Sequence, residues 1–314
     1  MNWTCKACIT VPKLIDVVPY IEPVSKTSFY LGYQQARNRI VIAFMGSEYF
    51  ENWIHNLDFT KVPFPSCEAS GCQIHRGFYT AYLSVRSKLI AELTKLTMKY
   101  PGAGIHLTGH SLGGALVNVC LLDLQSQSFH VTWFKNKREN NGDCHHSNTD
   151  LPDFSLGFTV ESTSPTMDLI NLQNFKFSSN LNVDFESESL TISFAEKLSY
   201  PQITLGAPRV GDPLLSKFLR DSNQKNPGDP SSILRIINEK DPIVHVPFTW
   251  LGFNHASREI FYTNSFSKYV ECSTSNLEDP ICAASQVWTT LEQLKDRMEF
   301  HDEYFNHEMN PDDC

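Results

Sequence analysis

The sequence contains no apolar run of about 18 or more residues, the length that a membrane-spanning helix needs, so we predict no transmembrane anchor. It also has no excess of positive charge: 26 lysines and arginines stand against 35 aspartates and glutamates, for a net charge of −9. The field of an acidic chain repels phosphate groups, so we expect no nucleic-acid partner. The first residues, MNWTCKACITVPK, lack the charged and then apolar pattern of a secretory signal.

Cysteine, by contrast, is frequent, with nine residues in the chain. Six of them form close pairs: Cys5/Cys8, Cys67/Cys72 and Cys272/Cys282. A redox CxxC should stand beside a βαβ pattern and a zinc site needs a second ligand pair, and the sequence offers neither. We therefore interpret the pairs as short disulfides, which indicate an oxidising compartment, secreted or in the secretory pathway. A start downstream of the true N-terminus would reconcile this interpretation with the missing signal.

The order of apolar segments predicts an α/β fold with a mostly parallel central sheet flanked by helices. Apolar runs typical of strands alternate with helical spacing over the segment that begins at Phe78 and ends before Pro101. The expected strands are Ser28–Gln34, Arg39–Phe44, Ile105–Thr108 and the runs YPQITLG and SILRIIN, with a helix at DPLLSKFLRD.

One long stretch, about 127–199, interrupts this alternation. It is rich in serine, asparagine and aspartate and has no clear periodicity, which indicates an insertion or a partly disordered excursion. His145 and His146 beside Cys144 could suggest a metal, but a flexible polar loop explains them better. We therefore predict a single domain over 1–314 with an atypical insertion at about 127–199, and no metal site.

The segment GHSLGG stands between an expected strand and an expected helix. Its G-x-S-x-G pattern consists of Gly109, Ser111 and Gly113. A serine on such a tight turn has an exposed Oγ, and side chains at the flanking glycines would collide with nearby backbone. The free N–H groups of the following helix point at the serine, where an oxyanion would form. The pattern predicts that Ser111 is a nucleophile, although an ordinary glycine-rich turn remains the alternative.

A nucleophilic serine needs a histidine base and a carboxylate, and in elbow enzymes the chain order is serine, acid, histidine. Asp241 follows the apolar run ILRIIN, and the carboxyl end of a strand is where an open α/β sheet carries its site. Asp212 competes for the role, but it is better placed to cap the helix that begins at Pro213. We select Asp241 as the acid.

Four histidines follow the selected acid: His245, His255, His301 and His307. His245 is only four residues beyond the acid, so we expect the two to share one loop. His255 precedes an expected strand, REIFY, and is interpreted as structural. His301, in EFHDEYF, lies in a polar segment that could return over the sheet edge. Position alone leaves His301 barely ahead of His307.

At this point the sequence resembles the fungal-type class 3 lipases, triacylglycerol lipases of α/β-hydrolase type. The matching segments, in order, are IVIAFMGSEYFENWIHNLDF, IHRGFYTAY, HLTGHSLGGALV, TLGAPRVGD, RIINEKDPIVHVPF, FNHASREIFY, EDPIC with Cys272, and HDEYF. They cover most of the chain outside the excursion. The resemblance implies Ser111 as nucleophile, Asp241 as acid and His301 as base, and makes His245 a structural position.

The resemblance also implies an oxyanion hole and a lid. Ser47, in the GS pair, would donate its backbone N–H, and the N–H of Leu112 would be the second donor. The following segment, EYFENWIHN, would be a lid that covers the serine in water and opens at a lipid surface. Its expected substrate-contacting residues are Tyr49, Phe50, Trp53 and Ile54. Met45 and Asn56 depart from the family pattern and put the polar tethers of the lid in doubt.

The function expected from the sequence is hydrolysis of lipid esters, by a Ser-His-Asp acyl-enzyme mechanism that requires no cofactor. The expected partners are a lipid ester and a lipid–water interface, and the chain is expected to be a monomer. Two alternatives stay open. One is another esterase on the same fold, such as a phospholipase A1. The other is a lipid-binding protein whose catalysis has decayed.

Overall fold

The computed structural model describes residues 13–46, 59–126, 128–136, 158–162, 185–198, 201–223, 233–256, 258–263, 266–273, 276, 278–286 and 297–309. They divide into two compact units, one formed by Met1–Ser126 with Ala195–Cys314 and the other by Gln127–Phe194. The first unit contains every described residue of the candidate site. None of the described helices combines the length and apolar character needed to cross a membrane.

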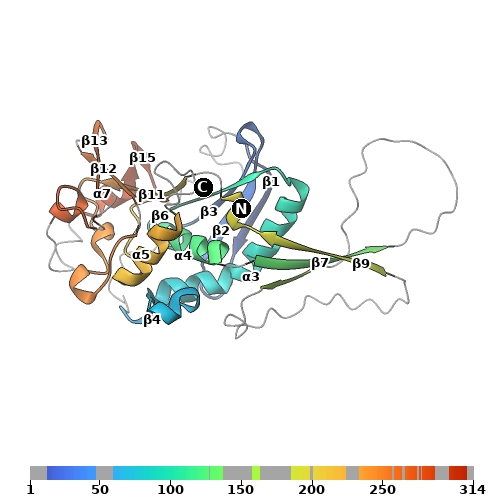
Figure 1. The fold of residues 1–314 in the computed structure, drawn as a ribbon. Helices are drawn as coiled ribbons and strands as arrows, with labels where there is room; N and C mark the ends of the chain where they lie inside the picture. The colour runs from blue at the N-terminus through green and yellow to red at the C-terminus, as the bar shows by residue number, and fades with distance from the viewer. Residues whose placement is uncertain are drawn as a thin grey trace. The chain divides into compact units, whose positions relative to one another are not determined.

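An eight-stranded sheet forms the centre of the first unit (Figure 1). Its strands, in spatial order, are β1 (Ile15–Ile21), β2 (Ser28–Gln34), β3 (Arg39–Phe44), β6 (Gly104–His110), β10 (Gln202–Leu205), β11 (Ile233–Asn238), β12 (Arg258–Thr263) and β13 (Lys268–Glu271). The five strands from β3 to β12 are parallel, and antiparallel strands close both edges. The predicted α/β fold with a mostly parallel sheet is therefore confirmed.

The apolar runs that predicted the central strands are buried because both faces of the sheet are covered. In β3, the segment Ile40–Phe44 is buried throughout, and Ile105 and Leu107 of β6 are fully buried beside it. Parallel strands place their carboxyl ends at one edge, so the loops after β6, β10 and β11 meet there. This edge carries the candidate site.

Four α-helices accompany the sheet among the described residues: α3 (Arg76–Lys99), α4 (Leu112–Ser126), α5 (Pro213–Asn223) and the short α7 (Glu299–Asp302). The pair α3 and α4 is joined by a buried ion pair, in which Arg86 Nε lies 2.8 Å from Asp123 Oδ2. The hydroxyl of Tyr82 donates to the same oxygen at 2.6 Å. This shared carboxylate fixes the helix that begins at the elbow against its neighbour.

The start of α5 is capped by Asp212, whose Oδ1 accepts from the backbone N–H of Leu215 at 2.7 Å. The role predicted for Asp212 is therefore confirmed. The connections also contain short 3-10 helices: η1 (Gln35–Arg37), η2 (Pro65–Ser70), η4 (Ala195–Lys197), η5 (Ile243–His245), η6 (Thr249–Leu251) and η7 (Ala283–Ser285).

Two small hairpins complete the first unit: β4 (Lys61–Pro63) with β5 (Gln73–His75), and β14 (Glu303–Tyr304) with β15 (His307–Glu308). The predicted Cys67–Cys72 disulfide closes the loop between β4 and β5, and the predicted Cys272–Cys282 disulfide is also present. Cys120 is a buried free thiol. The other cysteines, Cys5, Cys8, Cys144 and Cys314, lie outside the described residues.

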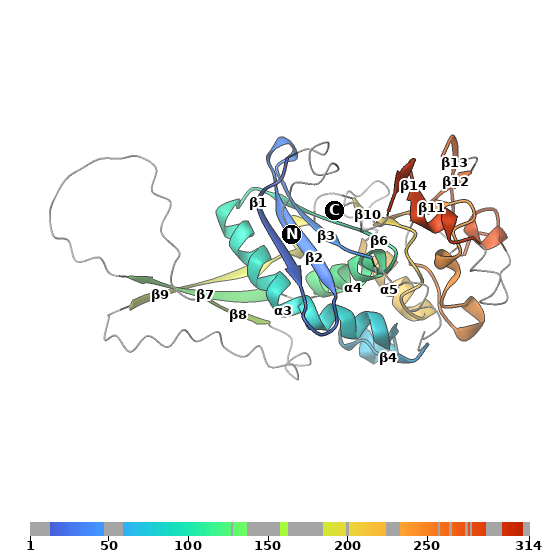
Figure 2. The same ribbon diagram turned by 180° about the vertical axis from the view of Figure 1, so that it is seen from behind.

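The second unit lies within the predicted insertion. It contains a three-stranded antiparallel sheet of β8 (Phe158–Ser162), β7 (Ser128–Asn136) and β9 (Phe185–Ser193), with β7 in the middle. The sequence did not predict these strands, because their polar residues hide the alternation and their pairing spans long intervals. Figure 2 shows the same strands from behind.

Candidate active site

Ser111 occupies the turn between β6 and α4 in the strained conformation expected of a nucleophile elbow. Its φ is +56°, in the left-handed region that L residues rarely adopt. A Cβ at residue 109 would lie 2.4 Å from the Gly113 carbonyl carbon, and one at residue 113 would lie 2.2 Å from Phe44 O. Only glycine fits at both positions, so the motif is required by the tightness of the turn.

The elbow is fixed to the neighbouring strands through its backbone. The Ser111 N–H donates to Leu205 O of β10 at 2.9 Å, and its carbonyl accepts from Gly114 N at 2.9 Å. The Ser111 side chain is 2 % exposed, and its Oγ makes no hydrogen bond to the part of the chain that the structure describes. The hydroxyl is therefore not engaged in holding the turn together.

The end of β3 lies beside the elbow. A Cβ at residue 46 would lie 3.5 Å from Ser111 Cβ and 3.4 Å from His110 O. Leu112 is the first residue of α4, and the first N–H groups of a helix have no partner within it. The predicted oxyanion donor Leu112 is therefore next to the serine, whereas Ser47 lies outside the described residues.

Asp241 is fully buried in the loop after β11 and is surrounded by hydrogen-bond donors. The Nδ1 of His301 lies 3.0 Å from its Oδ1 and 2.9 Å from its Oδ2. The N–H of Ile243 donates to Oδ1 at 2.8 Å, and the Tyr304 hydroxyl donates to Oδ2 at 2.6 Å. This is the arrangement by which a carboxylate orients an imidazole and stabilises its charged form.

His301 lies on α7 and is 2 % exposed. The short helix is held to the sheet by Asn238, whose side-chain Nδ2 donates to Phe300 O at 2.9 Å and to Glu303 O at 3.2 Å. His110, the residue before the serine, donates from Nε2 to His301 O at 2.8 Å. The structure thus brings His301, the predicted base, to Asp241, the predicted acid, and attaches it to the strand that precedes Ser111.

The chain is similar in sequence and fold to several known proteins. Residues 41–138 match the model of the family described as Lipase (class 3). The chain is 27 % identical over 286 residues to a lipase of Rhizomucor miehei, an alignment covering 91 % of this chain and 59 % of that lipase. A solved structure of Rhizomucor miehei triacylglyceride lipase superimposes with a TM-score of 0.64 and 25 % identity, covering 98 % of this chain and 86 % of that one.

The chain is thus similar in sequence and in fold to the class 3 lipases of fungal type. It spans about three-fifths of the length of the Rhizomucor miehei relative. A shorter match, 32 % identical over 113 residues, joins this chain to phospholipase A1-II 3 of Oryza sativa and covers 30 % of this chain and 27 % of that protein.

Three residues that adjoin Asp241 and His301 were not predicted to be parts of the candidate site. The hydroxyl of Tyr304 donates to Asp241. Burial, and then the negative charge of Asp241, raise the pKa of the Tyr304 phenol well above its usual value, so the phenol keeps its proton and remains a donor. His110 contacts the base, and burial followed by the charge of His301 lowers its pKa well below the usual value. Gly206, at φ +58°, leaves room for the acid: a Cβ there would lie 2.5 Å from Asp241 Oδ2.

Their signals in the sequence were present but ambiguous. Tyr304 and His110 stand within the motifs HDEYF and GHSLGG, and Gly206 ends the run YPQITLG. Each of these segments predicts a role, or a strand, that does not depend on these three residues. Nothing local indicates that a tyrosine donates to a carboxylate 63 residues earlier in the chain.

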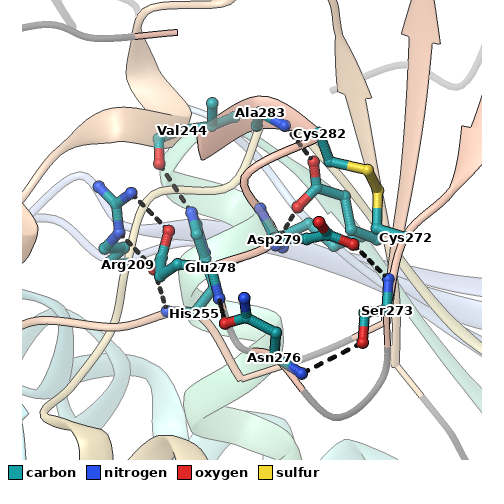
Figure 3. Close-up of polar contacts among 12 residues, drawn as sticks. Arg209, Val244, His255, Cys272, Ser273, Asn276, Glu278, Asp279, Cys282 and Ala283 are labelled. Atoms are coloured by element: carbon teal, nitrogen blue, oxygen red, sulfur yellow. Dashed lines mark hydrogen bonds and ion pairs between the residues drawn. A yellow bond between two sulfur atoms is a disulfide. The ribbon is translucent and has the colours of Figure 1, made fainter. Parts of the chain in front are cut away.

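The competing histidines lie elsewhere in the structure. His307 is exposed on β15. His255 is buried, its Nε2 lies 2.7 Å from Val244 O, and its backbone N–H donates to Glu278 Oε1 at 2.9 Å (Figure 3). Burial, followed by the charge of Arg209, lowers the pKa of His245 to about 3. The interpretation of His245 and His255 as structural therefore agrees with their burial.

A buried polar network supports the loop that carries the acid. Arg209 forms two bonds with Glu278, each of 2.8 Å (Figure 3). It also donates to the carbonyls of His245 and Pro247. It therefore joins the segment after β10 to the loop that follows Asp241.

One trio of potential metal ligands occurs among the described residues, namely Glu259, Cys272 and Cys282. The two sulfur atoms are bonded to each other in the disulfide, so they are not thiolate ligands. Glu259 is itself engaged by Arg235 Nη2 at 2.6 Å and by the backbone N–H of Ala283 at 2.9 Å. We therefore assign this trio a structural role.

The residues expected to form a lid, Tyr49, Phe50, Trp53 and Ile54, lie outside the described residues. Their roles and that of Ser47 stay predictions.

Proposed function

We propose that the chain is a serine hydrolase that cleaves the carboxylic esters of lipids, with triacylglycerol as the main substrate class. The observation that carries the proposal is the buried Asp241–His301 pair, bonded at 2.9 Å and attached through His110 to the strained turn of Ser111. A relative of substantial coverage is named a lipase, and a similar solved structure is that of a triacylglyceride lipase.

In the proposed reaction, His301 Nε2 accepts the hydroxyl proton of Ser111 as Oγ attacks the ester carbonyl. The carbonyl oxygen becomes an oxyanion, which accepts hydrogen bonds from the N–H groups of Leu112 and Ser47. Removing one such donor typically costs about 3 kcal/mol of transition-state stabilisation. Asp241 stabilises the imidazolium that forms.

The tetrahedral intermediate then expels the alcohol, to which His301 returns its proton, and leaves an acyl group on Ser111. Water attacks the acyl-enzyme with His301 again accepting a proton, the fatty acid leaves, and the serine regains its hydrogen. Every proton in this cycle moves through a side chain of the protein, so the mechanism calls for no metal or organic cofactor.

We further propose that the chain acts as a secreted monomer at a lipid–water interface. Relatives from Penicillium are named secreted mono- and diacylglycerol lipases, and the two disulfides suit an oxidising compartment. The catalytic side chains are at most 2 % exposed, so a substrate reaches them only after covering groups move, the role proposed for a lid at 48–56. The insertion at about 127–199 is proposed as an addition to one lipase domain.

The test is labelling with a fluorophosphonate probe that reacts with activated serines. We expect the wild type and the control Ser84→Ala, on an exposed part of α3, to be labelled and Ser111→Ala to be spared. An unlabelled wild type would favour a lipid-binding protein without catalysis.

A panel of emulsified triacylglycerol, phospholipid and soluble esters, run beside Ser111→Ala, then identifies the substrate. Faster release of fatty acid from phospholipid than from triacylglycerol would replace the proposed substrate by that of a phospholipase A1. A rate that rises smoothly through the solubility limit of the ester would contradict a working lid.

A further inference from the structure

Four aromatic side chains form a continuous cluster where two hairpins end, and we call it the aromatic tip: Tyr262, Phe266, Tyr269 and Phe305. Ring centroids are 5.2 Å apart for Tyr262 and Phe266, 5.3 Å for Tyr262 and Phe305, and 4.8 Å for Phe266 and Phe305. Tyr269 is 5.6 Å from Tyr262. Tyr269 is 58 % exposed and Phe305 is 37 % exposed, so part of this apolar surface faces outward.

The aromatic tip lies at the same edge of the sheet as the candidate site. Strand β12 runs parallel to β11, and Tyr262 pairs with Asn238, the residue that ends β11. The N–H of Asn238 donates to the Tyr304 hydroxyl at 3.2 Å, and the ring of Phe266 lies 5.5 Å from that of Tyr304. A surface that touches the aromatic tip is therefore close to the Asp241–His301 pair.

A second apolar projection lies on this edge. Val24 is 88 % exposed and Ile21 is 48 % exposed at the turn between β1 and β2. Phe29 at the start of β2 pairs with Phe44 at the carboxyl end of β3, which puts this turn at the carboxyl edge as well. Both views show the β1–β2 turn and the β12–β13 hairpin projecting to the same side of the first unit (Figures 1 and 2).

The charges around the aromatic tip limit what it can bind. Asp302, Glu303 and Glu308 are exposed beside it, against the exposed Lys268 on β13. This balance disfavours an anionic partner. Strand β13 is the last strand of the sheet among the described residues, and it carries charged residues, Lys268 and Glu271, at both ends. This pattern discourages pairing with a strand of another chain.

We propose that the aromatic tip and the β1–β2 turn dock the protein on the surface of uncharged or zwitterionic lipid. The inference rests on the proposed function, since it supplies the contact that holds the site against its substrate. Tyrosine and phenylalanine suit this role because they combine a large apolar ring with, in tyrosine, a hydroxyl that stays in water. Burying apolar area against the lipid provides the attraction, without help from basic residues.

The first experiment measures binding without turnover. Ser111→Ala protein is sedimented with vesicles of phosphatidylcholine, alone and with added Tyr269→Thr and Phe305→Asn substitutions. Asparagine tolerates the φ of +55° at residue 305, and threonine suits a strand, so both changes preserve the backbone. We expect the partition coefficient to fall about tenfold for each aromatic ring removed.

The matched control is Ile281→Ser. Ile281 is 68 % exposed, but it lies next to the disulfide and Glu259 region at the amino end of β12, away from the carboxyl edge. We expect this change to leave vesicle binding unaltered. The proposal would be overturned if the Tyr269→Thr/Phe305→Asn variant bound vesicles as well as the Ser111→Ala protein from which it is made. It would also be overturned if Ile281→Ser reduced vesicle binding as much as that pair of substitutions.

Two further measurements distinguish apolar docking from electrostatic attachment and from an effect on catalysis. Binding that increases with added phosphatidylglycerol would show an electrostatic attachment and contradict the assigned surface. The second measurement uses protein in which Ser111 is intact. The single variant Tyr269→Thr should show a lower ratio of the rate on emulsified ester to the rate on soluble ester than the wild type. Loss of hydrolysis in every form, with vesicle binding still dependent on the aromatic tip, would refute the proposed catalysis and leave the docking surface standing.

Discussion

The imidazole of His110 lies against that of His301, with ring centroids 4.4 Å apart, and its Nε2 lies 2.8 Å from the carbonyl oxygen of His301. The residue that precedes the proposed nucleophile therefore holds the segment that carries the proposed base. Because burial keeps His110 neutral, its single ring proton is available for this bond.

The first prediction follows from that bond. His110→Phe retains a ring beside His301 but removes the donor, whereas His110→Gln retains a donor near the Nε2 position. We expect kcat/KM on a soluble ester to fall about fivefold in His110→Phe, the equivalent of about 1 kcal/mol, and less in His110→Gln. Equal losses in the two variants would show that ring packing, and not the hydrogen bond, positions His301.

The second prediction concerns the hydroxyl that bonds Asp241. In Tyr304→Phe, Asp241 Oδ2 loses a donor and the N–H of Asn238 loses an acceptor, both in a buried position. We expect the free energy of unfolding to fall by about 1–3 kcal/mol in denaturant titrations, with a decrease in kcat/KM. Tyr269→Phe removes a hydroxyl from an exposed side chain and should change stability by less than about 0.5 kcal/mol.

The third prediction uses the space beside the acid. Gly206→Ala would place a Cβ 2.5 Å from Asp241 Oδ2 and 3.0 Å from His301 Nδ1, so the pair must move. We expect kcat/KM to fall about 100-fold, the order of loss that a displacement near 1 Å produces. Gly102→Ala is the control, since its Cβ would meet no atom closer than Asn38 Nδ2 at 3.9 Å. Full activity in Gly206→Ala would contradict the assigned acid–base pair.

The fourth prediction is a loss of stability in acid. Burial, and then the positive charge of Arg39, lower the pKa of His106 to about 4, and burial with Arg209 lowers that of His245 to about 3. Between these values and the unfolded value near 6.5, the unfolded chain binds protons that the folded chain does not. Stability is therefore greatest above about pH 6.5 and should fall as the pH decreases below it, by about 1.4 kcal/mol per pH unit for each group.

The check is the pH dependence of the free energy of unfolding in His106→Asn, which keeps a donor for Pro201 O. Its slope between about pH 4.5 and 6 should be smaller than that of the wild type by about 1.4 kcal/mol per pH unit. His307→Asn, at an exposed position, serves as control and should retain the wild-type slope. An unchanged slope in His106→Asn would show that His106 is not buried as a neutral group.

Local patterns predicted much of the fold. The runs Ser28–Gln34 and Arg39–Phe44 coincide with β2 and β3, and the helical spacing from Phe78 lies within α3. Strand β1 was not predicted, because it is a half-exposed edge strand that contains Pro19. The strands of the second unit were also missed, since their pairing joins residues far apart in a polar segment.

The sequence by itself determined the elbow at Ser111 and the preference for Asp241, because glycine spacing and the position after an apolar strand are local properties of the chain. It separated His301 from His307 only through a family resemblance, since both stand in one polar segment. Only the tertiary structure decided that His301 meets Asp241, that Tyr304 and His110 hold them, and that Gly206 gives them room. These contacts join residues tens to nearly two hundred positions apart, and their geometry depends on how the strands align, which no short pattern encodes.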